Sequence, residues 1–314
     1  MKRSCVLAVA LVITLASTGM AAEPDASGAQ IVVHEKSEPR HVRKDATPET
    51  AAQTGCCACP ADPTVTGDVY IGPISKYLFR GNDLSRSAAG SDFALQGGID
   101  LTYKAFTLSY WGNALNRYSR GNPNNFDENG NFIAHKRAKI NETDLILDYA
   151  VPYKLPYLDK VSFNVGTQYF AVEGIEDTNE FYLKATVDTL LKPTLTVYWD
   201  NMLATRAGLF YSAAIAHKIE LEHNMFNLNL GALVSYNQRN PNAAYTAEGD
   251  GVYNGWHNYE LTASIDYTPT ANITITPSYM FSNGISKQAK AKVEDGGVGI
   301  SAQNVFGIKA LFSF

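Results

Sequence analysis

Apolar residues occupy every second position in a series of strand-length segments that begins near Val69 and runs to the end of the chain. From Phe226 to Tyr236, for example, Phe, Leu, Leu, Ala, Val and Tyr share one register, with Asn, Asn and Gly between the first four of them. Successive side chains of a β-strand point to opposite faces, so this pattern predicts strands with one apolar and one polar face. Such segments begin near Val69, Leu95, Phe106, Leu145, Val161, Phe181, Leu195, Leu209, Phe226, Tyr259, Ile273 and Val305.

The apolar faces of these segments end in aromatic residues. Nearly every segment places Tyr, Phe or Trp at the boundary of its apolar face. A soluble β-sandwich also has two-faced strands, but an aromatic girdle is typical of strands that cross a bilayer. We therefore predict an all-β fold, a transmembrane antiparallel up-and-down β-barrel of about 12 strands over residues 67–314, with Val69 to Arg80 as its first strand. No segment approaches the roughly 18 continuous apolar residues of a membrane-spanning helix.

The lengths of the connections orient this barrel. An even number of strands leaves both ends of the chain on one side, and in outer-membrane barrels that side is the periplasm, where turns are short. The long polar connections are Leu115 to Lys139, Asn237 to His257 and Asn283 to Ala302, and all of them fall on the predicted external side. Val172 to Thr178 and Met202 to Arg206 also fall there, although they are short.

The chain before residue 67 lacks the alternating pattern. Residues 1–22 join Lys2 and Arg3 to an apolar run and a small-residue stretch, as a cleaved signal peptide does. Residues 23–66 are polar and are predicted to form a flexible periplasmic tail. Phe312 and Phe314 resemble the C-terminal signal of bacterial outer-membrane proteins. Together these features predict a Gram-negative cell outer membrane as the location, with outer-membrane lipid around the barrel.

The predicted tail carries the Cys-rich motif Cys56, Cys57 and Cys59. Three thiolates so close together make a weak candidate for a metal site, because zinc requires a fourth ligand and His41, the nearest histidine, lies in flexible chain. One disulfide and one free or intermolecular thiol is the other interpretation. The net charge of −5 gives no basic excess, so nucleic acid is not an expected partner.

Three short motifs resemble a known family. The run Ser75 to Gly81, the run Gln96 to Asp100 and the terminal Phe314 are similar to those of TorF-type porins of Gram-negative bacteria. This resemblance covers most of the chain from about Asp68 onward. It implies an outer-membrane barrel with a channel role, and the barrel-assembly machinery as a partner; it brings no catalytic residues.

If the apolar face meets lipid, the other face lines a lumen whose charges are the candidates for pore selectivity. Carboxylates outnumber basic groups there, which favours a cation-preferring pathway for a small-molecule or ion permeant. Alternatively, the charges pair across a narrow bore, since about twelve strands enclose less space than sixteen. Tyr70, Trp111, Tyr182 and Tyr198 also face inward and could fill much of it. The charged candidates are Lys76, Arg80, Asp100, Asp144, Asp148, Glu180, Lys184, Asp188, Asp200, Glu260, Asp266 and Lys309.

The function predicted from these features is a porin-like channel, narrow or gated, for passive diffusion of small polar or charged solutes. A structural or adhesin/receptor-type barrel with a plugged lumen is the alternative, and an outer-membrane hydrolase is a weaker one. A hydrolase would use a histidine near the external rim, where His135 and His257 are both expected in loops without a Ser motif or paired Asp. Asp127, Glu128 and Asn129 lack the spacing of a dedicated calcium loop. We expect no enzyme activity and no cofactor.

Overall fold

The computed structural model describes residues 65–87, 93–116, 139–153, 157–172, 177–201, 208–221, 225–240, 253–290 and 300–314. The predicted signal peptide, tail and Cys56, Cys57 and Cys59 lie outside these residues. So do Asp127, Glu128, Asn129 and His135 of the predicted external loop.

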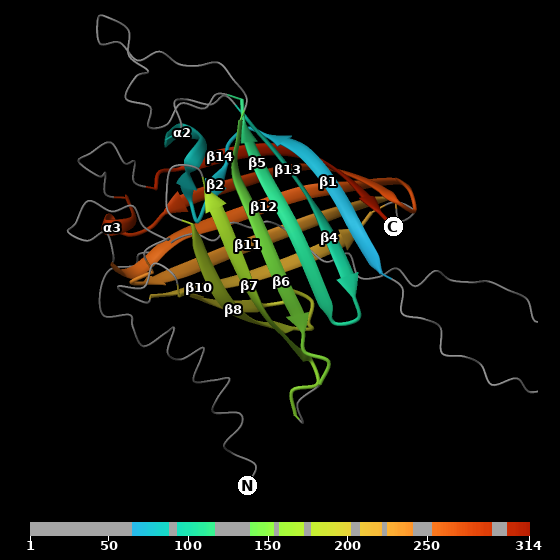
Figure 1. Ribbon diagram of the computed structural model, residues 1–314, viewed down its shortest axis with the longest axis horizontal. Helices are drawn as coiled ribbons and strands as arrows, with labels where there is room; N and C mark the ends of the chain where they lie inside the picture. The colour runs from blue at the N-terminus through green and yellow to red at the C-terminus, as the bar shows by residue number, and fades with distance from the viewer. Residues whose placement is uncertain are drawn as a thin grey trace, which may run out of the picture.

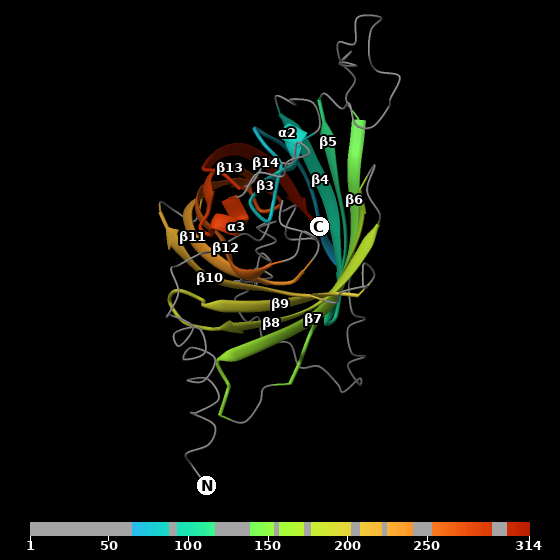
Figure 2. The ribbon, with the colours of Figure 1, turned by 90° about the vertical axis from the view of Figure 1, so that its left-hand side faces the viewer.

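The described residues form a closed barrel of twelve antiparallel strands, in which each strand pairs with its neighbours along the chain and β1 closes onto β14 (Figures 1 and 2). The predicted fold class and strand number are confirmed. Among the described residues, no helix has the length and hydropathy needed to cross a bilayer. The wall strands are β1 (Thr66–Ile74), β4 (Ala94–Tyr103), β5 (Phe106–Leu115), β6 (Lys139–Ala150), β7 (Val161–Val172), β8 (Thr178–Val187), β9 (Thr194–Asp200), β10 (Leu209–Glu220), β11 (Phe226–Gln238), β12 (Asn254–Thr270), β13 (Ile273–Gly284) and β14 (Gln303–Ser313).

The two faces of the wall have opposite chemistry. On β6, Leu145 and Leu147 are exposed on the outer surface, whereas Asp144 and Asp148 on the alternate positions are buried. A soluble protein rarely exposes a continuous apolar surface of more than a few hundred Å². The barrel does so on all sides, as lipid-facing strands require. Exposed apolar side chains on other wall strands include Val69, Ile71, Leu95, Leu108, Val165, Phe181, Leu183, Trp199, Ile215, Leu230, Leu261, Ile265, Ile273, Phe306, Ile308 and Phe312.

Aromatic pairs flank the apolar surface at both ends of the barrel. Near the short turns, Phe106 packs on Tyr149 with ring centroids 4.7 Å apart. At the other end, Tyr236 and Trp256 make an edge contact at 5.7 Å. Aromatic rings at both boundaries are typical of strands anchored at the two membrane interfaces.

The first predicted strand is too long by six residues, because β1 ends at Ile74 and not at Arg80. Beyond Ile74 the chain leaves the wall and turns into the barrel, where β2 (Leu78–Phe79) and β3 (Asn82–Asp83) pair as a hairpin and α2 (Leu84–Ser87) follows. Figure 2 shows β3 inside the ring of wall strands. Lys76 and Arg80 therefore do not belong to the wall, and we call residues 75–87 the inner hairpin.

The connection predicted from Asn237 to His257 is shorter than expected. β11 continues to Gln238 and β12 begins at Asn254, so His257 lies in a strand and is buried. In the connection from β13 to β14, a single helical turn, α3 (Lys287–Lys290), follows the last residue of β13. Figure 1 shows α2 and α3 at the end of the barrel opposite to the C-terminus.

Candidate functional site

The inner hairpin makes its tight turn at Arg80 and Gly81. Leu78 pairs with Asp83 and Phe79 with Asn82, which leaves two residues at the tip, with φ values of 48° and 77°. Positive φ at both central residues is the geometry of a hairpin turn whose twist matches that of its strands. Gly81 is also required by space, because a Cβ there would lie 2.2 Å from Nδ2 of Asn258.

The base of the hairpin packs against the barrel wall. Tyr77 is fully buried and its ring lies 5.5 Å from that of Trp111 on β5. Its amide donates a hydrogen bond of 2.5 Å to Oγ of Ser85, and its carbonyl accepts one of 2.9 Å from the amide of Leu84. Phe79 packs edge-on against Phe170 of β7 at 5.6 Å. The hairpin thus has its own hydrogen bonds and an aromatic seat on the inner wall.

Arg80 carries its guanidinium across the lumen to Glu180 at the start of β8. Nη1 and Nη2 donate to Oε1 at 2.8 Å and to Oε2 at 2.5 Å, a bidentate ion pair. The side chains of Arg80 and Glu180 are only 3% and 0% exposed. Buried charges are stable only when they are paired and hydrogen-bonded, and this pair meets both conditions.

Aromatic rings surround the same guanidinium. Its carbon lies 4.2 Å from the ring centroid of Phe210, 5.2 Å from that of Tyr198 and 5.0 Å from that of Phe79. A cation within about 6 Å of an aromatic centroid is attracted by the negative face of the ring, most strongly where water is excluded. Arg80 is therefore held by a carboxylate and by three rings.

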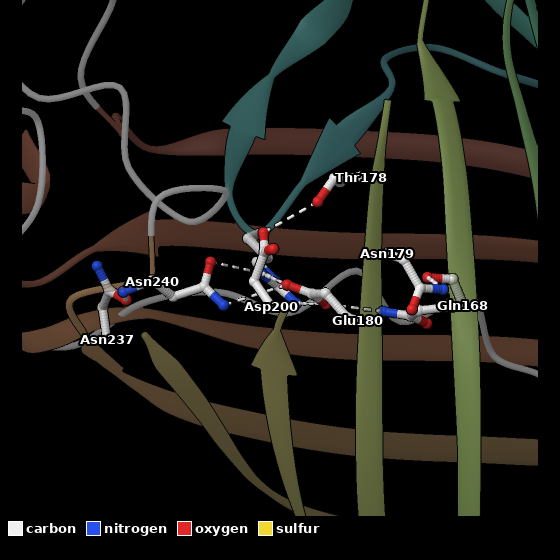
Figure 3. Close-up of polar contacts among 8 residues, drawn as sticks. Gln168, Thr178, Asn179, Glu180, Asp200, Asn237 and Asn240 are labelled. Carbon is white, nitrogen blue, oxygen red and sulfur yellow. Dashed lines mark hydrogen bonds and ion pairs between the residues drawn. The ribbon is translucent and has the colours of Figure 1, made fainter. Parts of the chain in front are cut away.

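Wall residues position Glu180 and complete the contacts of the hairpin tip (Figure 3). Gln168 Nε2 and Asn240 Nδ2 donate to the Glu180 carboxylate at 3.0 and 3.1 Å, from opposite sides of Glu180 in the figure. Asn240 Oδ1 also accepts from Arg80 at 3.4 Å. His257 Nε2 lies 3.1 Å from the carbonyl oxygen of Arg80, and its Nδ1 contacts the hydroxyl of Tyr253. One ring nitrogen of His257 therefore contacts the hairpin backbone, and the other contacts the neighbouring residue Tyr253.

Other inward carboxylates are less well satisfied. Glu142 and Asp144 on β6 are 2% and 4% exposed, and Glu142 Oε2 and Asp144 Oδ1 have no hydrogen-bond partner within the described residues. The same holds for Oε2 of Glu260 on β12. By contrast, Asp148 accepts from Asn164 at 2.7 Å and from Tyr182 at 2.6 Å. Each of these three carboxyl groups, Glu142, Asp144 and Glu260, thus has one oxygen that accepts no hydrogen bond from the described residues.

The remaining sequence-predicted residues lie in several places. Asp200, at the end of β9, is buried and accepts from Thr178 at 3.0 Å. Asp266 accepts from Asn229 at 2.9 Å and Thr276 at 2.8 Å, close to the end of the barrel with the short turns. Lys76 donates to Gln303, and Lys309 lies over the ring of Tyr70 at 5.8 Å. Asp100 and Lys184 are partly buried on β4 and β8.

Asp188 departs from the prediction, because it lies after the end of β8, in an exposed turn closed by its amide on the carbonyl of Lys160 at 2.7 Å. The cause is that β8 stops at Val187, one residue short of the predicted lumen position.

Sequence reasoning missed several residues of the Arg80 site. Glu142 shares the inward register of Asp144, so the alternation already contained a signal for it. Phe210 likewise takes the inward register of β10, between the half-buried Leu209 and Tyr211. Asn240 and the barrel role of His257 had no local signal, because both contact a hairpin tip that is 160 and 177 residues away in the chain.

The described residues contain no group of three or more His, Cys, Asp or Glu side chains arranged to hold a metal ion. The site instead offers a bidentate carboxylate, amide groups and aromatic faces, and these groups hold the guanidinium of Arg80.

No known family model matches the chain, and no curated protein matches it. The resemblance to TorF-type porins therefore stays a prediction. Among solved structures, the chain is similar to the NanC porin, with 13% identity, coverage of 79% of this chain and 100% of that one, and a TM-score of 0.46. The KdgM porin in complex with disordered oligogalacturonate has 10% identity and a TM-score of 0.40, with coverage of 79% of this chain and 99% of that one. An anion-selective porin from Comamonas acidovorans has 9% identity and a TM-score of 0.34, with coverage of 80% of this chain and 99% of that one. At these values the likeness concerns the barrel architecture alone.

Proposed function

We propose that this protein is an outer-membrane channel through which small polar or charged solutes diffuse passively. The observation that carries the proposal is the polarity of the barrel, which is opposite to that of a soluble protein. The outer surface is apolar, and the interior is lined with carboxylates, amides and hydroxyls. Buried polar groups that lack hydrogen-bond partners cost free energy, so the unsatisfied carboxyl oxygens inside this barrel favour a lumen that admits water. A polar lumen is the usual interior of barrels that conduct.

The inner hairpin makes this channel narrow or gated. Twelve strands enclose a smaller bore than the sixteen or more of general porins. The hairpin occupies part of that bore at the end away from the C-terminus, where Arg80 reaches the opposite wall. Large solutes are therefore excluded, and passage depends on the position of the hairpin.

The charge balance of the lumen supports a preference for cations. Arg80 is already neutralised by Glu180, and Lys76 is bound to Gln303. Glu142, Asp144 and Glu260 each keep an oxygen without a hydrogen-bond partner in the described part of the chain. Carboxylates that line a pore attract cations and repel anions.

The orientation in the membrane is part of the same proposal. The short turns and the C-terminus lie at one end of the barrel, which we assign to the periplasm together with the N-terminal tail. The hairpin end then faces outside. Phe312 and Phe314 are exposed on β14 and just after it, as a signal read by the barrel-assembly machinery would be.

Planar-bilayer recording on the purified, refolded protein tests the proposal. We expect discrete conductance steps and a reversal potential in a salt gradient that favours potassium over chloride. A barrel that is folded by circular dichroism and stays silent in every preparation would contradict a channel function.

A second candidate is a structural or adhesin/receptor-type barrel with a permanently plugged lumen. The burial of Tyr77, Leu78 and Arg80 between the walls favours it. Silence of both the wild type and Arg80→Ala in bilayers, combined with binding of cells or macromolecules to protein-bearing vesicles, would support this function over a channel. Neither function requires a catalytic residue or a cofactor.

A further inference from the structure

The groups that hold the Arg80 guanidinium belong almost entirely to the barrel wall. Glu180 lies on β8, Tyr198 on β9, Phe210 on β10, and Asn240 two residues after the end of β11. These four strands are consecutive neighbours in the sheet. We call these four residues, with Gln168 on β7, the guanidinium cage. Because the wall strands position the cage, it persists when the hairpin moves.

The chemistry of the cage is matched to a guanidinium group and not to cations in general. The two carboxylate oxygens of Glu180 face two nitrogens at 2.8 and 2.5 Å, a fork that a planar guanidinium fills and a spherical ion does not. The faces of Phe210 and Tyr198 lie 4.2 and 5.2 Å from the guanidinium carbon and favour a flat, weakly hydrated cation.

The cage is also organised before a ligand arrives. Hydrogen bonds from Gln168 at 3.0 Å and Asn240 at 3.1 Å orient the carboxylate of Glu180. The amide of Asn240 is held in turn, since its own backbone amide donates to Asn237 Oδ1 at 3.0 Å. Departure of Arg80 would leave a fully buried carboxylate without a counter-charge, which strongly favours entry of another cation.

We propose that the cage is a binding site for solutes that carry a guanidinium group, and that Arg80 occupies it as a tethered substitute for such a solute. A soluble guanidinium compound competes with Arg80, and the hairpin tip leaves the far wall when the compound is bound. The proposal rests on the channel function above, because release of the tip widens the bore.

Ser75, at the start of the hairpin, can remain in place during this exchange while the residues beyond it move. The amide of Ser75 donates to the carbonyl of Phe306 at 2.8 Å, and Ser75 Oγ accepts from the amide of Phe306 at 2.9 Å. These bonds tie the start of the hairpin to β14, so the tip moves on a fixed hinge. A short tether gives Arg80 an effective concentration on the order of millimolar, so the competitor must reach about that concentration.

The test uses methylguanidinium chloride as the probe and methylurea as its neutral counterpart. Trp111 packs on Tyr77, which lies two residues beyond Ser75 in the part of the hairpin that moves, so Trp111 fluorescence reports the movement. Trp111→Phe identifies the contribution of this residue among the three tryptophans. For the wild type, we expect methylguanidinium to change Trp111 fluorescence saturably and to increase conductance. Methylurea and the same added potassium chloride should do neither.

Two variants separate the cage from the hairpin. Arg80→Ala leaves the cage free, so methylguanidinium should bind at least tenfold more tightly than to wild type, seen as a raised unfolding temperature at lower probe concentration. Glu180→Gln removes the fork, so binding should be lost; Asn240→Ala, which removes two contacts at a strand end, serves if Glu180→Gln does not fold. Arg239→Gln, an exposed arginine at the same rim, is the matched control and should behave as wild type.

The outcomes distinguish this proposal from the channel function. Conductance that is insensitive to methylguanidinium, with no change in Trp111 fluorescence and no binding to Arg80→Ala, would overturn the cage proposal and leave the channel. Saturable fluorescence and binding without any conductance would support the cage and contradict the channel. An equal response to methylurea would also overturn it.

Discussion

Arg80 buries a positive charge inside the barrel, and the groups around it compensate that charge. The cost of burial is offset by a bidentate carboxylate, the amide of Asn240 and the faces of Phe210 and Tyr198. At this scale a single side chain connects two walls of the molecule, because its length spans the gap that the hairpin leaves. Changes at Arg80 and Gly81 therefore act on the position of the hairpin.

Arg80→Lys should weaken the contact of the hairpin tip with Glu180 while keeping the positive charge. An ammonium cannot form the bidentate pair with Glu180, and the loss of one charge-assisted hydrogen bond is about 1.5–3 kcal/mol. The released hairpin should then be populated at least about tenfold more than in wild type. Bilayer recordings should show a larger open fraction. Conductance equal to that of wild type would contradict the hypothesis that the Arg80–Glu180 pair holds the hairpin in the bore.

Gly81→Ala tests the turn. The φ of 77° and the approach of a Cβ to within 2.2 Å of Asn258 Nδ2 should destabilise the seated hairpin by about 1–3 kcal/mol. Trp111 fluorescence and the urea midpoint measure the effect. Gly255→Ala is the control, because a Cβ there meets Tyr253 at an ordinary 3.4 Å, and it should change little. Equal effects of the two substitutions would argue against a strained tip.

At the scale of elements, the wall strands form the rigid sheet, and the connection after β1 forms the hairpin inside it. The wall strands alternate apolar and polar residues and are paired on both edges, so each has a fixed register. The segment after Ile74 is not a strand of the wall and carries apolar side chains on both of its faces, with Tyr77 and Leu78 both buried. A rigid wall thus supports a hairpin that is held by a few specific contacts.

A charge on the lipid face should separate membrane strands from turns. Leu145 lies near the middle of β6 and is 49% exposed, so Leu145→Arg should cost about 2–4 kcal/mol in lipid. Leu190 lies in the turn between β8 and β9, so Leu190→Arg should cost about 0–1 kcal/mol. Reversible urea unfolding in vesicles provides the comparison. A similar small cost at both positions would contradict a lipid-facing β6.

At the scale of the whole molecule, the closed sheet creates an interior that no single strand possesses. Closure of β1 on β14 is reinforced by Ser313 Oγ donating to Asp68 at 2.5 Å and by paired backbone bonds between Gly67 and Phe314 of 2.9 Å each. Within that interior the carboxylates of β6 and β12 face one another from opposite sides of the ring. In the proposed channel, a permeating ion therefore passes between carboxyl groups on both sides of the lumen.

Neutralising two of these carboxylates should reduce cation preference. In a potassium chloride gradient, the double variant Glu142→Gln with Asp144→Asn should move the reversal potential toward zero, because the lumen loses two of the carboxyl groups that favour cations. Asp188→Asn is the matched control, since that carboxylate lies in an exposed turn. A shift equal to that of the double variant would show that selectivity comes from the mouth and not from the lumen.

The wall was predictable because each of its strands is specified locally. The alternating pattern assigns Leu145 to the outer face and Asp144 to the inner face, and the same rule places Glu142 and Phe210 inside. The inner hairpin was not predictable in this way. Alternation continues through Tyr77 and Phe79 as it would in a strand, and an apolar residue is equally suited to lipid and to a packed interior. Asn240 and His257 could not be assigned, because their partner is remote in the chain.

The sequence by itself determined the class of fold, the number of strands and the sides of the wall, since the period of two acts within each strand. Only the tertiary structure decided that Arg80 crosses the lumen to Glu180, 100 residues away, and that the turn after β1 fills part of the bore. The physical reason is that such contacts depend on barrel closure. Closure brings β8 to β11 opposite the β1 connection, and no local pattern encodes that distance.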